Sequence, residues 1–463
     1  MASGAETINV EQQIDSQPMS VYQMWMVFFG GLILFIDGLD VQLVSYIGPK
    51  ILSEWSISRT LLGTIFSSMI WGLLIGFAFV APLSIRFGHR PLVILNMVLF
   101  GLATMMAYFV HDPTSMIALR VVAGIGLGGA LPSGVALTGE YGPKRLRSTC
   151  IALIYCGYSL GTIAAGLLAG ALLERYGWRL YMVAGGLIPI AIAVFLYFML
   201  PESLEYLISK GAPRMTIARL AKRLAPAADI GEATVFTVYG KRETALAVAQ
   251  LFQNGRTLGT LMLWLGLFMN LMVIFFVLQW LPSIFTMVGY TQAQATTAAT
   301  WATGGGILAA LILGPLMDWF GPYRVIMVLF MVGGAFLFFT GLSVHSAAIL
   351  ATAVAFVAMG CTSGIQKCIN ALMVFFYPTA LRSTGLGWAF GVGRFGAMIG
   401  PILAGFLFDR KWPVDQVFDV YAIPMIIGGV AILVMYLTYR EPKIAVVSSA
   451  VVGGMAPASR GSR

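Results

Sequence analysis

Two aspartates lie three residues apart inside the first long apolar run of the chain, residues 28–44. Their i, i+3 spacing places Asp37 and Asp40 on one face of a helix. A carboxylate near the centre of a bilayer costs roughly 3 kcal/mol on insertion scales, so two of them are seldom tolerated by chance. Ionisable groups at that depth usually bind a substrate or an ion, or they carry a proton. The two acids therefore predict a transport function.

Arg120 is the base expected to meet these acids. It lies about six residues into the fourth apolar run, which places it at about the depth of Asp40. A buried carboxylate and a buried guanidinium at one depth are expected to pair, because each alone is strongly unfavourable. Two interpretations remain open. Two acids facing one base leave one carboxylate free to titrate, which makes a proton site; alternatively, the pair is a permanent link between the first and fourth spans.

Two further bases lie inside spans of the second half of the chain. Arg394 is at the middle of the eleventh span, where no acid of the second half can neutralise it. An unpaired buried arginine binds an anion, and its fork fits a carboxylate; the alternative is bonding to backbone carbonyls of a broken helix. Lys367 in the tenth span is weaker evidence, because it lies within about two turns of the end of that span and can extend outward. The shortage of negative charge favours an anionic substrate.

Uncharged polar and aromatic side chains within spans complete the candidate cavity, because a polar group in a span needs a partner. The candidates are Tyr155, Tyr158, Asn270 and Gln279, with Trp388 as a further aromatic one. Most aromatics in spans serve packing or the interfacial belt. The four cysteines lie in or beside spans and are interpreted as packing residues, and the three histidines lack partners at metal-ligand spacing. No metal site, no cofactor and no enzymatic nucleophile–base set is expected.

Composition identifies the elements that position these residues. The chain has 463 residues, of which 59% are hydrophobic and only 10% are charged; soluble proteins carry about 25% charged residues. Twelve apolar runs are long enough to span a bilayer as helices. The sequence therefore predicts an all-α membrane protein of twelve transmembrane helices.

Basic residues indicate the orientation of these spans. Most of the 28 Lys and Arg residues fall in connections on the side of the two termini, which the positive-inside rule assigns to the cytoplasm. The basic excess is thus a topology signal and not a nucleic-acid footprint. The first twenty residues hold no Lys or Arg, so no secretory signal is expected and the first span is retained.

The two halves of the chain resemble each other. Residues 82–88 align with 315–321, and residues 147–149 align with 382–384 in a register that continues to 168–170 and 403–405. Two six-span halves in parallel orientation are a transporter architecture. The predicted division is a cytoplasmic tail 1–20, a half 21–200, a cytoplasmic linker 201–256, a half 257–440 and a cytoplasmic tail 441–463. Asp37 aligns with Asn270 and Arg394 with Ser159, so these charges are not demanded by the fold.

These residues resemble the major facilitator superfamily and, within it, the aromatic acid:proton symporters such as the 4-hydroxybenzoate and benzoate transporters. The resemblance rests on Asp37-Gly38-Leu39-Asp40, on Arg120 with the glycine-rich run to Glu140-Tyr141, and on Gly387-Trp388 with Gly393-Arg394. It implies proton symport of an aromatic carboxylate into a bacterium across its inner membrane. It points to Asp37, Asp40, Arg120 and Glu140 for proton coupling and to Arg394 for the substrate.

The chain also departs from the family pattern. The loop between spans two and three, with Arg86, Gly88 and Arg90, has Ile85 where the superfamily motif carries an acid. The second-half copy keeps Asp318 and Gly321, and Arg382 belongs to the following repeat motif; together these positions form the expected conformational lock. Ser133 stands where many relatives carry Asn, and Lys367 is an unusual charge. Both differences are compatible with a larger substrate or one with two carboxylates.

The function predicted from the sequence is proton-coupled import of an aromatic carboxylate by alternating access, carried out by a monomer with both termini in the cytoplasm. The partners are the substrate, protons and the lipid bilayer, without nucleic acid. An exporter of drugs or metabolites would have cationic or neutral substrates and would leave Arg394 unexplained. A non-transporting sensor would need a large cytoplasmic effector segment, and the tail after Lys443 is short.

Overall fold

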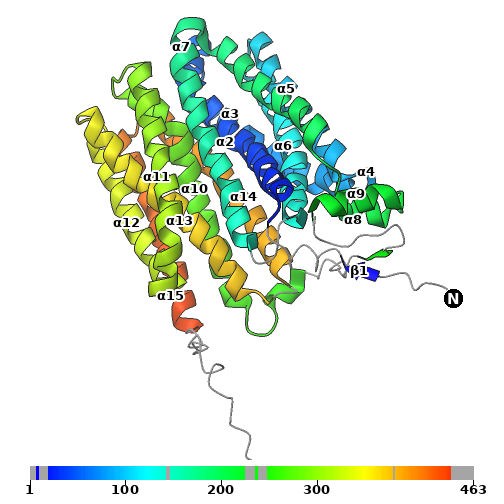
Figure 1. Ribbon diagram of the computed structural model, residues 1–463. Coiled ribbons are helices and arrows are strands. Elements are labelled where there is room, and N and C mark those ends of the chain that lie inside the picture. The colour runs from blue at the N-terminus through cyan, green and yellow to red at the C-terminus, as the bar shows by residue number, and fades with distance from the viewer. Residues whose placement is uncertain are drawn as a thin grey trace, which may run out of the picture.

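The computed structural model describes residues 7–9, 19–141, 146–224, 235–237, 248–378 and 381–439, so most of both predicted tails lies outside the described residues. Long helices run side by side in two groups (Figure 1). The first group holds α2 (Val21–Trp55), α3 (Arg59–Ile75), α5 (His89–Met106), α6 (Pro113–Tyr141) and α7 (Arg147–Met199). A π segment (Gly76–Val80), a 3-10 turn (Ala81–Leu83) and α4 (Ser84–Phe87) continue the span of α3.

The second group holds α10 (Thr257–Met287), α11 (Gln292–Phe320), α12 (Pro322–Ser343), α13 (Ala348–Phe376), α14 (Arg382–Asp409) and α15 (Val414–Thr438). Polar caps start several helices: Ser20 with Gln23 at α2 and Thr291 with Gln294 at α11 both form capping boxes. Helix α11 is bent by 43° between its parts Gln292–Ala310 and Ile312–Phe320.

Helix α7 contains two spans. Gly177 has φ 78° and ψ 171°, which interrupts the helix. The hydroxyl of Tyr181 donates to the carbonyl of Ala165 at 3.0 Å; a straight helix would separate these residues by about 24 Å, so the chain doubles back. Ten helices are long and apolar enough to cross a membrane, and the bent α11 brings the number to eleven in the described residues. The two limbs of α7 complete the twelve predicted spans.

The internal repeat has a structural counterpart. Gly88 and Gly321, which align in sequence, both take a positive φ, 95° and 82°. Each ends one helix and begins the next, between α4 and α5 and between α11 and α12. The same turn therefore recurs at the same place in both halves, which agrees with the predicted pseudo-symmetry.

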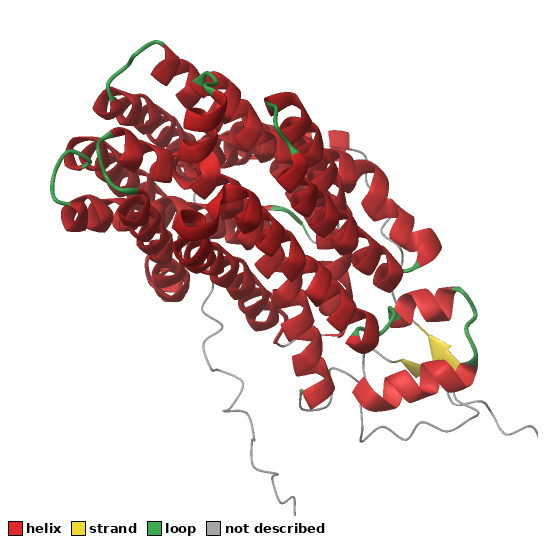
Figure 2. Cartoon of the chain, turned by 90° about the horizontal axis from the view of Figure 1, so that it is seen from above, coloured by secondary structure: helices red, strands yellow, loops and turns green. Residues whose placement is uncertain are grey.

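Two small helices, α8 (Leu204–Ser209) and α9 (Arg214–Leu224), follow the first group. We call the end of the bundle where they lie the linker face, and the opposite end the far face. A parallel pair of strands, β1 (Thr7–Asn9) and β2 (Val235–Thr237), lies beside them, apart from the bundle (Figure 2). The sequence analysis did not predict this strand pair.

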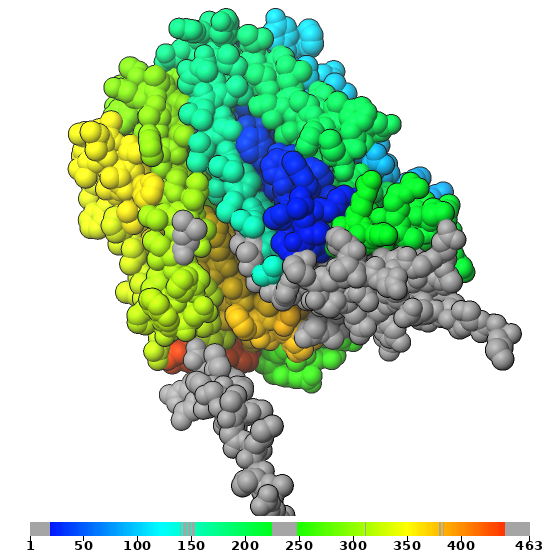
Figure 3. All heavy atoms as spheres, in the orientation of Figure 1, coloured from blue at the N-terminus to red at the C-terminus, as the bar shows by residue number. Residues whose placement is uncertain are grey.

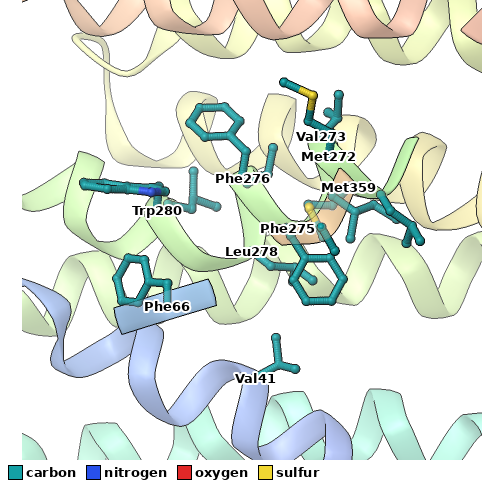
Figure 4. Packing of buried hydrophobic residues seen from close by; sticks show 14 of the residues in the cluster. Val41, Phe66, Met272, Val273, Phe275, Phe276, Leu278, Trp280 and Met359 are labelled. Atoms are coloured by element: carbon teal, nitrogen blue, oxygen red, sulfur yellow. The ribbon is translucent and has the colours of Figure 1, made fainter. Parts of the chain in front are cut away.

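The two groups of helices meet mainly near the far face. Helix α7 runs along their border on the side that Figure 3 shows, between α2 and the second group. Phe66 of α3 packs edge-on against Trp280 of α10 at 5.6 Å, and Val41 of α2 lies toward Leu278 (Figure 4). Among the described residues, every hydrogen bond between the halves lies in this far part of the bundle, at α2–α10, α2–α11, α3–α10 and α3–α14. The structure is thus closed at the far face.

Candidate functional site

The predicted ion pair is present between α2 and α6. Both guanidinium amino groups of Arg120 donate to the two carboxylate oxygens of Asp40, each at 2.6 Å. The two side chains are almost fully enclosed, with 0% of Asp40 and 3% of Arg120 exposed. The sulfur of Met69 lies 2.9 Å from the same guanidinium. This bidentate pair joins the first and fourth spans and leaves Asp37 unpaired by Arg120.

Asp37 instead lies within electrostatic range of a base in the second half of the chain. Its carboxyl group is partly exposed, and the charge that acts most strongly on it belongs to Arg394 of α14. Arg394 is likewise half-buried. Neither side chain has a hydrogen bond or a contact ion pair within the described parts of the chain. The acid within electrostatic range of Arg394 therefore belongs to the first half of the chain. The sequence analysis considered only acids of the second half.

Two tyrosines of α7 adjoin this pair of charges. Tyr155 and Tyr158 both lie within electrostatic range of Asp37 and Arg394. Helices α2 and α7 can approach so closely because Gly38 has no side chain: a Cβ there would lie 1.9 Å from the carbonyl oxygen of Tyr158. We call Asp37, Tyr155, Tyr158 and Arg394 the central site. It combines an acid, a base and two aromatic rings from three helices, which suits an aromatic anion.

The polar candidates of α10 occupy different places. Asn270 is fully buried, and neither its amide nitrogen nor its amide oxygen has a partner among the described residues. A buried amide without partners is costly, so Asn270 stays a candidate for contact with a ligand or water. Gln279 donates to the carbonyl of Phe66 at 3.3 Å, which makes it part of the closure at the far face.

Lys367 of α13 does not extend to the linker face. Its ammonium donates to the carbonyl of Gly306 in α11 at 2.6 Å and is half-buried. Cys156 of α7 lies within electrostatic range of it. Bonding to a backbone carbonyl of a bent helix, the alternative considered for Arg394, is therefore found for Lys367.

No interaction joins Ser133 or Trp388 to the central site within the described structure. Ser133 is buried and shares the face of α6 on which Gly126 and Gly129 approach Asn96 of α5. Trp388 is 49% exposed on the face of α14 that also bears Phe395, and it stacks on Trp264 at 6.3 Å. Exposed apolar side chains on one stripe of a spanning helix are typical of contact with lipid.

Glu140 lies at the linker face, remote from the ion pair. Its carboxylate accepts from the hydroxyl of Ser203 at 2.6 Å and from the backbone N–H of Glu205 at 2.7 Å, at the start of α8. Burial raises its pKa to about 7, against the opposing effect of the Ser203 hydrogen bond. The sequence analysis grouped Glu140 with Asp37 and Asp40 for proton coupling, but Glu140 lies at a different depth from these two acids.

This pKa predicts a pH-dependent stability. Because the pKa in the folded protein is raised, the folded protein binds more protons than the unfolded chain between about pH 4.5 and pH 7, and its stability falls as pH rises through that window. Glu140→Gln should flatten the dependence of the melting temperature between pH 5 and 8. Asp112→Asn is the control, because its hydrogen bond with Ser115 lowers the pKa of Asp112. If the melting temperature of Glu140→Gln varied with pH as steeply as that of the parent, the raised pKa of Glu140 would not be the cause of the pH dependence.

The residues of the expected conformational lock are dispersed. Arg86 and Asp318 are exposed, and Asp318 makes no ion pair within the described residues. Arg90 donates to the carbonyl of Tyr197 at 2.6 Å, inside the first half. Gly88 and Gly321 form the turns described above, and Arg382 begins α14 with its Nε buried and unpartnered in the described structure.

The sequence analysis missed Glu202. Its carboxylate accepts from the backbone N–H groups of His89 at 2.9 Å and Arg90 at 3.2 Å, at the start of α5. A Cβ on Gly88 would lie 2.3 Å from this carboxylate, and the positive φ of 95° at Gly88 also favours glycine there. Glu202, which follows the sixth span, thus brings an acid to the loop region where Ile85 replaces the acid of the superfamily motif. In the sequence, only its position next to Pro201 indicated this role. Among the described residues no group of side chains suits a metal ion.

Known proteins are similar to this chain in sequence and in fold. The model of the Major Facilitator Superfamily matches residues 30–390 and 263–459. The 4-hydroxybenzoate transporter PcaK of Pseudomonas aeruginosa is 33% identical over 431 residues, covering 92% of this chain and 96% of the relative. The gallate transporter of Pseudomonas putida is 33% identical over 427 residues, covering 92% and 94%.

Among solved structures, the xylose transporter XylE from E. coli has a TM-score of 0.68 at 18% identity and covers 91% of this chain and 100% of its own. That likeness shows the shared fold. The family predicted from the motifs is confirmed, and with it a multi-pass membrane protein of the transporter class. The chain belongs to the Major Facilitator Superfamily.

Proposed function

We propose that this protein imports an aromatic carboxylate with protons across the bacterial inner membrane. The observation that carries the proposal is the central site, where Arg394 and Asp37 come from different halves and lie within electrostatic range of each other, without a bonded partner among the described residues. A guanidinium without a bonded partner can bind a carboxylate bidentately, by donating two parallel hydrogen bonds. The curated relatives, transporters of 4-hydroxybenzoate, gallate and benzoate, support the same class of substrate.

The orientation follows from the distribution of charge. The linker face bears Arg86, Arg90 and the basic helix α9, so we assign it, and both termini, to the cytoplasm. The closed far face then belongs to the periplasmic side, and the described state faces inward. The halves 21–200 and 257–440 rock against each other around the central site, joined by the linker 201–256, and one monomer suffices.

Asp37 and the substrate compete for Arg394 in this mechanism. With Asp37 ionised, its charge partly neutralises the guanidinium. A proton on Asp37 removes this competition, so the substrate carboxylate can bind Arg394 while its ring contacts Tyr155 and Tyr158. Asp40 and Arg120 stay paired throughout and hold α2 against α6. Glu140 remains a candidate for proton exchange at the cytoplasmic side, because its pKa of about 7 lies near neutral pH.

The energy source depends on stoichiometry. One proton moving with one monoanion transfers no net charge, so the pH gradient alone drives it. A second proton adds a charge for which a potential of about 150 mV supplies roughly 3.5 kcal/mol. Accumulation beyond the pH gradient would therefore indicate two protons.

Asp37→Asn tests the coupling. The amide cannot take up or release a proton, so we expect exchange of labelled 4-hydroxybenzoate across proteoliposomes to persist while accumulation driven by an imposed pH gradient is lost. Asp419→Asn, at an exposed acid of α15, is the matched control and should behave like the parent. Normal pH-driven accumulation by Asp37→Asn would refute the proton role, and the absence of aromatic-acid uptake by the parent would refute the substrate class.

A further inference from the structure

One carboxylate joins the far ends of α3 and α14. Asp409, the last residue of α14, accepts from the backbone N–H groups of Arg59 and Thr60, each at 2.8 Å, and from the Thr60 hydroxyl at 2.6 Å. The Arg59 guanidinium in turn donates to the carbonyl of Phe408 at 3.2 Å. Since α3 and α14 belong to different halves, all four bonds cross between the halves.

The bonds satisfy groups that α3 cannot satisfy itself. The first N–H groups of a helix have no partner within the helix and carry its positive dipole end. Among the described residues, the Ser58 hydroxyl accepts only from the N–H of Leu61, at 3.1 Å. The N–H groups of Arg59 and Thr60 are left for Asp409, so the other half of the protein supplies part of the helix cap.

Close backbone contacts lie directly beneath this carboxylate. A Cβ on Gly63 would lie 2.3 Å from the carbonyl oxygen of Pro401, and one on Gly405 would lie 2.3 Å from that of Arg59. One turn further in, the hydroxyl of Ser67 donates to the carbonyl of Met398 at 2.8 Å. The helices α3 and α14 cannot part at the far face without breaking the bonds of Asp409.

The internal repeat offers a comparison. The register that aligns the halves places Glu174 opposite Asp409 and Gln292 opposite Arg59. The start of α11 is capped by its own Thr291 and Gln294, and within the described structure Glu174 makes no hydrogen bond to α11. Only one of the two equivalent helix ends is therefore capped across the halves, so the contact is not a requirement of the fold.

We propose that Asp409 is the latch of the outer gate: it holds the N-terminus of α3 while the protein faces inward, and its release is a step of the reorientation that opens the far side. The proposal concerns the conformational equilibrium and does not depend on the identity of the substrate. Asp409 acts here as a positioning residue.

The test measures access to the gate from the far side. In a chain with its four native cysteines replaced by serine, Ser67→Cys places a thiol beneath the latch, where the native side chain is 1% exposed. Asp409→Ala should raise the rate at which a membrane-impermeant maleimide labels this introduced thiol from outside roughly tenfold, the factor for loss of a strong helix cap to alanine. Thr60→Val removes one bond of the three and should raise the rate by a smaller factor.

Glu174→Ala is the matched control, because it removes the equivalent acid at the same face. Its labelling rate should equal that of the parent. Equal rates for Asp409→Ala and the parent, or an equal rise for Glu174→Ala, would overturn the proposal. Because the labelling needs no substrate, this result stands even if the protein fails to transport aromatic acids.

Discussion

Arg120→Met is expected to lower the thermal stability of the protein more than any other single change considered. Asp40 is fully enclosed, and loss of both 2.6 Å bonds from Arg120 leaves its charge without a partner. Removing one member of a buried ion pair costs about 3–5 kcal/mol, because the remaining charge stays desolvated. Arg120→Lys should give a smaller loss, because its ammonium keeps a positive charge beside Asp40; a loss remains, because an ammonium cannot form the fork. The melting temperature in detergent measures both effects.

The double variant Asp40→Asn with Arg120→Gln separates charge from packing. It removes both charges and keeps most of the volume, so we expect it to recover most of the stability lost in Arg120→Met. A parent-like melting temperature for Arg120→Met would show that the pair does not anchor α2 to α6. Equal instability of the double variant would assign the cost to packing instead.

The sequence predicted this pair from depth alone, because unbalanced charges inside a bilayer must meet. It did not predict that Asp37 would be left for the second half. The i, i+3 spacing turns Asp37 about 60° from Asp40 around the helix, and the neighbours of α2 decide what each acid meets. Asp40 meets α6, whereas Asp37 lies beside Tyr158 of α7 and within range of Arg394.

The twelve spans were predictable, because bilayer thickness sets the length of each apolar run. The rotation of a helix about its axis was less predictable: it leaves Trp388 and Phe395 exposed on one face of α14 and turns Ser133 to the side of α6 that bears Gly126 and Gly129. Glu202 and Asp409 were missed because each meets backbone N–H groups that are far away in sequence. Backbone donors carry no sequence signal, so such contacts appear only once the helices are assembled.

Arg394→Ala is expected to weaken binding of aromatic carboxylates about 100-fold or more. A hydrogen bond to a charged group contributes about 1.5–3 kcal/mol, and a fork that binds a carboxylate supplies two. The described residues of the second half offer no other free guanidinium beside Tyr155 and Tyr158, and Lys367 is bonded to Gly306. Arg394→Lys should bind more weakly than the parent but better than Arg394→Ala. Calorimetric titration of the purified protein with 4-hydroxybenzoate measures all three affinities.

A comparison of benzoate with benzamide isolates the charge. The parent should strongly prefer benzoate, because only the anion can take both bonds of the Arg394 fork. In Arg394→Ala the preference should disappear, since both ligands then keep only ring contacts. Arg175→Ala, at an exposed arginine of α7, serves as the matched control and should keep the preference. If Arg394→Ala still distinguished the acid from the amide, the carboxylate would have to bind elsewhere, and the competition between Asp37 and the substrate would lose its physical basis.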